Sequence, residues 1–228
     1  MRRGDCQRLR MRPFACQLLL LFFVAASSFA AEESDTKAQQ LAREVWKAGG
    51  GENWSRIAQL RFTFIVEEPG KQLIAAEHQW DLRANTDHVK WKDKEATADL
   101  SAPPADGDAK AAYARWVNDS YWLLAPLKIL DPGVKLAYEG IKNEAGVACE
   151  TLRLSFEQVG LTPGDQYVFY IDPQTKLLRA WDYVPNPATV IHSTWENYES
   201  FGGLQLATMH NVAGKVIRFA DIKAVVAQ

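Results

Sequence analysis

The sequence of 228 residues has little of what marks several large classes of protein. It contains only three cysteines and four histidines, and its 26 basic and 28 acidic residues leave a formal charge of −2. Three cysteines cannot form a disulfide framework. A near-neutral chain without a lysine or arginine block also lacks the electrostatic footprint of nucleic-acid binding. We therefore expect neither a disulfide-stapled mini-protein nor a nucleic-acid-binding protein.

Catalytic and metal-binding motifs are also missing. The histidines at positions 78, 88, 192 and 210 are scattered, without the close spacing of a zinc site. No Gly-x-Ser-x-Gly elbow occurs. Gly49-Gly50-Gly51 lacks the lysine and hydroxyl residue of a phosphate loop, and we interpret it as the end of a helix. The sequence predicts no catalytic residue, no metal and no cofactor.

No apolar run reaches the roughly twenty residues that a membrane-spanning helix needs. Nine apolar residues, Leu18 to Ala26, follow five arginines and precede a small-x-small site at Ser28-Phe29-Ala30. This pattern is typical of a secretory signal peptide. We expect residues 1–30 to direct export to the periplasm, with residues 31–228 as a single soluble domain that has no integral membrane anchor. Removing five arginines and one aspartate changes the formal charge to −6 and leaves Cys149 alone, which we interpret as a small buried hydrophobe.

What the chain has in excess is aromatic side chains, with eight tryptophans, ten phenylalanines and seven tyrosines. All eight tryptophans lie after residue 30. Large rings of this kind either fill a core or line a space for an apolar ligand. The sequence leaves both possibilities open.

The pattern along the chain begins with a helix and continues mostly as strands. Apolar spacing predicts one helix from the Asp35 cap to Gly49 and a second over residues 112–124, ending before Pro126. Alternating patterns predict early strands over residues 61–66, 76–82 and 89–91. Further runs predict a meander of seven strands over residues 134–138, 148–156, 166–171, 177–184, 190–198, 204–211 and 216–225. Connections this short favour antiparallel pairing. We predict an α+β fold, a strongly curved antiparallel sheet forming an unclosed β-barrel, with helices covering its concave face.

The order of these segments resembles a known family. An opening helix ending in Ala48-Gly49-Gly50, a helical insertion and a meander with the turn at residues 170–175 are similar to the LolA and LolB lipoprotein-carrier superfamily. Residues 118–126 and 160–165 look like signatures of uncharacterised exported proteins thought to share that fold. The resemblance implies a hydrophobic cavity under a helical lid that receives acyl chains. It also implies a basic residue near the cavity mouth, for which Arg83 is the candidate.

The candidate ligand-binding residues are aromatic side chains that can face the concave interior. These are Phe64, Trp80, Trp91, Trp116, Trp122 and Trp181. Large residues before Pro126 predict a lid formed by Tyr121, Leu123 and Leu124.

These observations predict a non-enzymatic periplasmic binding or carrier protein that we expect to be a monomer. Its expected partners are a hydrophobic small molecule or acyl chain, or a lipoprotein or envelope protein. Two alternatives stay open. One is an envelope protein-interaction module with a filled core. The other is a hydrolase or isomerase acting on an apolar substrate, which needs His78 or His88 to converge with a carboxylate inside the cavity.

Overall fold

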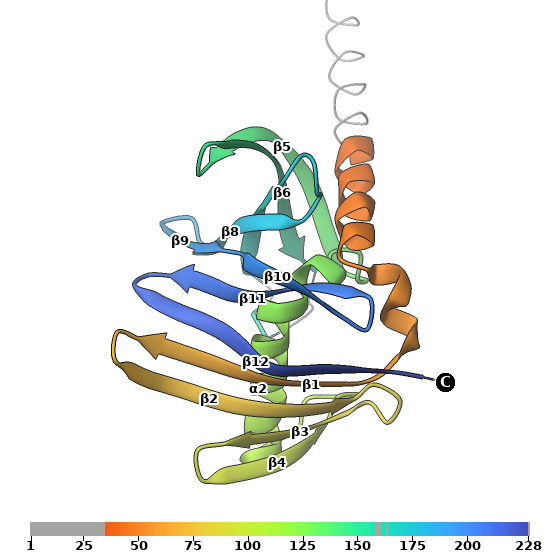
Figure 1. The fold of residues 1–228 in the computed structure, drawn as a ribbon, viewed down its shortest axis with the longest axis vertical. Helices are drawn as coiled ribbons and strands as arrows, with labels where there is room; N and C mark the ends of the chain where they lie inside the picture. Colours follow the sequence, from red (N-terminus) through yellow and green to blue (C-terminus); the bar gives the residue numbers. More distant parts are fainter. Residues whose placement is uncertain (1–34, 158–160, 163, 228) are drawn as a thin grey trace, which may run out of the picture.

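The computed structural model describes residues 35–157, 161–162 and 164–227 (Figure 1). The predicted signal peptide lies outside these residues. The described part begins with a helix over residues 35–48 and the short helix η1 (Gly51–Arg56). The long helix α2 (Gly107–Leu124) is followed directly by η2 (Ala125–Leu127). The strands are β1 (Ile57–Glu68), β2 (Lys71–Asp81), β3 (Thr86–Trp91), β4 (Lys94–Asp99), β5 (Val134–Glu144), β6 (Val147–Phe156), β7 (Gln166–Ile171), β8 (Leu178–Asn186), β9 (Thr189–Thr194), β10 (Glu196–Phe201), β11 (Leu204–Val212) and β12 (Lys215–Val226).

These strands form one antiparallel sheet in the order β4-β3-β2-β1-β12-β11-β9-β8-β7-β6-β5, with β10 paired to β11. The predicted fold class is confirmed, because the sheet is curved and does not close. Two details of the prediction were wrong. Residues 94–99 form a strand that was not predicted, and the run predicted over residues 190–198 is two strands, β9 and β10, separated at Trp195.

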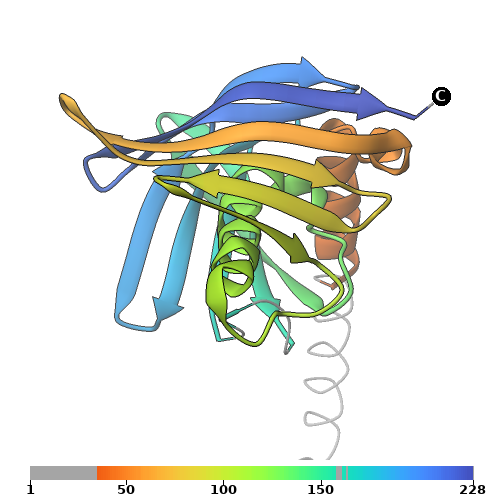
Figure 2. The ribbon, with the colours of Figure 1, turned by 90° about the horizontal axis from the view of Figure 1, so that it is seen from below.

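The chain crosses the concave face of the sheet as it passes from one edge to the other. β4 and β5 are the two edge strands, and α2 lies between them in sequence. Its 18 residues span about 27 Å at 1.5 Å per residue. Figures 1 and 2 show α2 running inside the curve of the sheet. The β1–β12 pairing, from Ile57↔Val226 to Glu67↔Val216, joins the early hairpins to the later meander.

Glycines end the first helix as the sequence predicts. Helical structure stops at residue 48, and Gly50 adopts φ +82°, a left-handed conformation that suits glycine. A Cβ atom at Gly50 would lie 2.1 Å from the carbonyl oxygen of Gly203, so the two backbones meet too closely for a side chain. The side-chain amide of Asn53 donates a hydrogen bond to that same carbonyl oxygen at 3.1 Å. This contact fixes the helix end against the β10–β11 turn.

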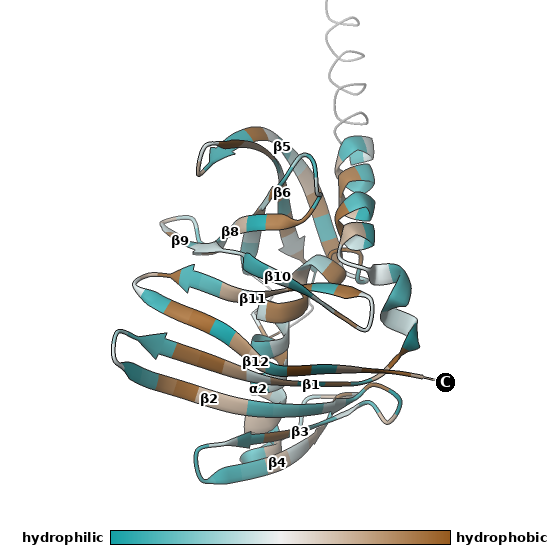
Figure 3. Ribbon diagram, in the orientation of Figure 1, coloured by the Kyte–Doolittle hydropathy of each residue, from teal (hydrophilic) through white to brown (hydrophobic). Residues whose placement is uncertain are grey.

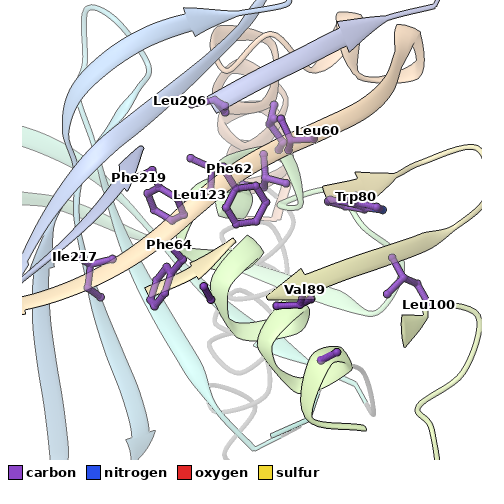
Figure 4. Close-up of a cluster of buried hydrophobic side chains, with 14 of the residues drawn as sticks. Leu60, Phe62, Phe64, Trp80, Val89, Leu100, Leu123, Leu206, Ile217 and Phe219 are labelled. Atoms are coloured by element: carbon purple, nitrogen blue, oxygen red, sulfur yellow. The ribbon is translucent and has the colours of Figure 1, made fainter. Parts of the chain in front are cut away.

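Two hydrophobic clusters fill the interior. The first packs β1–β4, β11 and β12 against α2, and Figure 4 shows Phe62, Phe64, Trp80 and Leu123 among its side chains. The second packs residues 35–48 and η2 against β6–β8, with Trp181 among its fully buried members. Apolar and polar bands alternate along the strands (Figure 3), as expected for a sheet with one covered face. Trp122 packs against both clusters, so α2 joins the two halves of the interior.

Candidate functional site

A cavity of about 580 Å³ lies between α2 and strands β6–β8, and we call it the aromatic cavity. α2 lines it with Tyr113, Trp116, Val117, Ser120 and Tyr121, which share one stripe at helical spacing. The sheet lines it with Phe156, Tyr167, Trp181 and Tyr183. Trp181 and Tyr183 are two residues apart on β8, and Tyr167 pairs directly with Tyr183 across the β7–β8 ladder. Strand alternation therefore turns all three rings toward the helix.

The rings of the cavity pack around Trp181. The Trp181 ring centroid lies 4.7 Å from that of Tyr167 and 4.6 Å from that of Trp122. Tyr121 stacks on it nearly in parallel, at 5.7 Å and 22°. The Trp195 ring meets the Trp181 ring edge-to-face, with the centroids 5.1 Å apart. Contacts of this kind fix the wall of the cavity, because offset and edge-to-face ring pairs add to the energy of simple burial.

The polar groups of the cavity divide into paired and unpaired ones. The Tyr183 hydroxyl donates to Asp165 at 2.8 Å, and Lys128 donates to Asp131 at 3.3 Å. By contrast, the hydroxyls of Tyr121 and Tyr167 make no hydrogen bond to any described residue. Burial raises the pKa of both tyrosines, so each hydroxyl keeps its proton at neutral pH.

An open groove of about 480 Å³ lies on the other side of α2. Phe64, Ile74 and Ile217 line it from β1, β2 and β12, and Arg115 and Asp119 line it from the helix. Trp122 borders both the groove and the aromatic cavity. α2 therefore separates two spaces on the concave face of the sheet.

A buried polar cluster ties α2 to the sheet beside the groove. His78 of β2 lies with Nδ1 2.6 Å from Asp87 of β3 and Nε2 3.2 Å from Asp119 of α2. The side chains of His78 and Asp87 are fully buried, and Arg115 approaches Asp119 at 3.7 Å. Burial alone would lower the pKa of His78, but the contacts with Asp119 and Asp87 outweigh it and raise that pKa. Burial likewise raises the pKa of Asp87.

This cluster bears directly on the enzymatic alternative. His78 does converge with two carboxylates, as that alternative requires. However, each ring nitrogen already faces a carboxylate, and the ring stacks on Phe62 at 4.5 Å. Neither nitrogen is free to take a proton from a molecule in the groove or the cavity. His88 lies apart from the cluster, with Nδ1 3.0 Å from the Thr97 hydroxyl. The geometry fits a structural tie between helix and sheet.

The structure divides the aromatic residues singled out from the sequence. Trp116, Trp122 and Trp181 line the aromatic cavity, and Phe64 lines the groove. Trp80 and Trp91 lie buried in the first hydrophobic cluster and line neither space.

Of the residues predicted for the lid and the mouth, only one lines the aromatic cavity. Tyr121 lines the cavity, whereas Leu123 and Leu124, the last two residues of α2, are fully buried and line neither space. Arg83 is exposed in the turn between β2 and β3 and lines neither space.

Sequence reasoning missed part of the cavity wall. Tyr167 and Tyr183 lie in runs that the sequence predicted as strands, but they were not singled out. A signal was present, because Tyr167 and Phe169 alternate on one strand and Trp181 and Tyr183 on another. Large rings at every second position indicate a face packed against something bulky.

No group of three His, Cys, Asp or Glu side chains in the described ranges is placed to hold a metal ion. None of the described helices combines the length and apolarity needed to cross a bilayer.

Comparison with known proteins places the fold. A scan against family models and a search of curated proteins gave no match. A crystal structure of a DUF1329 family protein from Desulfovibrio piger is similar over 86% of this chain and 95% of that chain, with 13% identity and a TM-score of 0.50. The crystal structure of a LolA superfamily protein from Nitrosomonas europaea covers 82% of this chain and 94% of its own, with 9% identity and a TM-score of 0.49. At 13% identity the likeness to the DUF1329 family protein is one of fold alone, and it supports the predicted curved-sheet fold.

Proposed function

We propose that this protein is a periplasmic, non-enzymatic binding or carrier protein that holds an apolar ligand in the aromatic cavity, with α2 as the movable cover. The ligand class is a lipid, the acyl chain of an acylated protein or another hydrophobic molecule. The observation that carries the proposal is the cavity itself, about 580 Å³ and lined by eight aromatic side chains. Ligand pockets for small molecules have volumes of roughly 300–1,000 Å³ and mostly apolar walls.

The chemistry of the wall supports binding through burial of apolar surface. Each buried methylene contributes roughly 0.8 kcal/mol, so a twelve-carbon chain supplies on the order of 9 kcal/mol before ordering costs. The groove on the other side of α2 adds a second space with apolar side chains from β1, β2 and β12. A shift of the helix would therefore change the size of both spaces together.

The first experiment asks whether the protein carries a ligand from its own compartment. The protein is purified from its native envelope, extracted with organic solvent and analysed by mass spectrometry. A co-purifying lipid or other apolar molecule is the expected result. Binding is then measured directly from quenching of tryptophan emission by a brominated monoacylglycerol, since Trp116, Trp122 and Trp181 border the cavity.

A pair of matched variants locates the binding site. Val117 lines the cavity from α2, and Val117→Phe adds bulk there without adding a fluorescent tryptophan. Val190 is 61% exposed on β9 and lines neither space, so Val190→Phe is the control. We expect Val117→Phe to weaken binding of the brominated probe at least tenfold and Val190→Phe to leave it unchanged. Absence of both a co-purifying ligand and quenching in the unaltered protein would refute the carrier function.

A further inference from the structure

The aromatic cavity has more hydrogen-bond donors than it uses. The indole nitrogens of Trp116 and Trp181 are buried without a hydrogen-bond partner, and both residues line the cavity. The hydroxyls of Tyr121 and Tyr167 also lack a partner among the described residues. Indole nitrogen can only donate, and a protonated tyrosine hydroxyl can donate to the oxygen of a carbonyl, a carboxylate or a phosphate. The two tyrosine hydroxyls are not among the buried unpartnered atoms of the described residues, so they are accessible donors on the cavity wall, and this wall is complementary to a ligand that supplies an acceptor.

The charges around the cavity favour a neutral acceptor group over a negatively charged one. The described lining carries one lysine and two aspartates, and Lys128 is already paired with Asp131. The Asp165 carboxylate accepts a hydrogen bond from the Tyr183 hydroxyl at 2.8 Å. A free carboxylate or phosphate would therefore meet a net negative surface, whereas a neutral carbonyl would not be repelled.

The two unpaired tyrosines are placed to act on one ligand group. Their ring centroids lie 5.2 Å apart, with Tyr121 reaching from α2 and Tyr167 from β7. A carbonyl oxygen has two lone pairs and can accept from both hydroxyls. The rings beneath them, from Trp181 and Phe156, leave an apolar surface for the attached chain.

We propose that the aromatic cavity recognises a neutral acyl ester, whose carbonyl oxygen accepts hydrogen bonds from the hydroxyls of Tyr121 and Tyr167 while its chain lies against the rings of β6–β8. This inference rests on the proposed function and gives its ligand a chemical class. An ester-linked acyl glycerol fits it, and an ionised free fatty acid does not.

The test compares two lipids that differ only in the carbonyl. Monolauroylglycerol has an ester, and dodecylglycerol ether has the same chain and head group without the carbonyl oxygen. Binding of each, below its critical micelle concentration, is measured by calorimetry. We expect the unaltered protein to bind the ester about five- to tenfold more tightly than the ether, the effect of one or two net hydrogen bonds. Laurate at neutral pH is expected to bind no better than the ether.

Variants then assign the preference to the two hydroxyls. The double change Tyr121→Phe and Tyr167→Phe removes both donors but keeps the rings, so the ester-to-ether ratio is expected to fall to about one. Tyr170 donates to Asp182 and does not line the cavity, so Tyr170→Phe should keep the ratio of the unaltered protein.

The outcomes separate the two proposals. Equal binding of ester and ether by the unaltered protein overturns the ester inference but leaves the carrier function standing. A ratio that survives in the double variant also overturns it, because the selectivity then comes from another group. Binding of neither lipid overturns the ester inference, and it overturns the carrier function as well only when no ligand co-purifies with the protein. If the double variant fails to fold, the comparison of ester and ether binding by the unaltered protein still tests the ester inference.

Discussion

His210 is buried among aromatic rings with only one of its nitrogens satisfied. Its Nδ1 donates to the carbonyl oxygen of Thr194 at 3.0 Å, which leaves the proton-free Nε2 without a partner in the described structure. The rings of Trp122, Trp195 and Phe219 surround it at centroid distances of 5.4, 4.6 and 5.9 Å. Burial lowers the pKa of His210 to about 4. A second proton on this ring would place a charge inside the apolar interior.

This residue predicts a loss of stability in mild acid. The unfolded chain takes up a proton on His210 near pH 6.5 and the folded chain only near pH 4, so the unfolded state binds more protons between these values. The free energy of unfolding should therefore fall as pH drops from 6.5 to 4, by on the order of 3 kcal/mol from this group. Urea unfolding at both pH values, followed by tryptophan emission, measures the difference.

Two glutamine variants isolate the contribution of His210 to the loss of stability in acid. His210→Gln cannot gain a charge but keeps an N–H donor for Thr194, so its stability should fall less between pH 6.5 and 4 than that of the unaltered protein. His88→Gln changes a half-exposed histidine and should show the unaltered pH dependence. Equal acid sensitivity in all three proteins would show that His210 is not the cause.

At the scale of the element, α2 is held by very different contacts along its length. Near its C-terminal end, Asp119 is buried against His78. At its first turn, Asp108 is about half exposed and accepts from Lys94 at 2.8 Å. Breaking a buried ion pair leaves an uncompensated charge, whereas exposed pairs contribute about 0–1 kcal/mol.

We therefore predict that two identical substitutions on this helix have unequal effects. Asp119→Ala should lower the free energy of unfolding by about 3–5 kcal/mol, and Asp108→Ala by less than about 1 kcal/mol. Amide hydrogen exchange should also show faster opening of α2 in Asp119→Ala. Similar losses in both variants would mean that the buried cluster does not hold the helix.

The elements that the sequence predicted well are those with a strong local pattern. Residues 76–81 alternate buried and exposed positions in β2, as their hydrophobic pattern predicts. β4 was missed because Lys94-Glu95-Ala96-Thr97-Ala98-Asp99 offers no large apolar side chain. Only Ala98 of this strand is buried. Pairing with β3 and packing under α2 make it a strand, and neither contact is visible locally.

The candidate site was less predictable because it depends on contacts between distant residues. Trp122 and Trp181 are far apart in sequence, yet their rings lie 4.6 Å apart because α2 crosses the curve of the sheet. The same crossing brings Asp119 to His78. Composition could identify aromatic residues as candidates. It could not separate Trp80, which fills the core, from Trp116, which borders the cavity.

At the scale of the whole molecule, the unclosed sheet has two edge strands whose unpaired backbone groups could pair with another molecule. β4 and β5 each pair with one neighbour in the described structure, so each has one row of backbone groups not paired within the sheet. β5 carries Lys135 and Lys142 along such an edge, paired with Glu157 and Glu139. Charged side chains, lysine above all, discourage edge-to-edge association. The sheet can therefore stay unclosed around the cavity, because its β5 edge carries charged side chains.

The expected monomer therefore depends in part on these lysines. Changing both to valine, Lys135→Val with Lys142→Val, should produce association that grows with protein concentration, as neighbouring molecules pair their β5 edges. Light scattering coupled to size-exclusion chromatography measures the mass. Lys90→Val with Lys223→Val is the control, since these exposed lysines lie on β3 and β12, whose two sides are already paired. If the two double variants associate equally, general surface hydrophobicity is the cause. If the β5 variant alone associates, the lysines protect an edge that the sheet must leave open to admit α2.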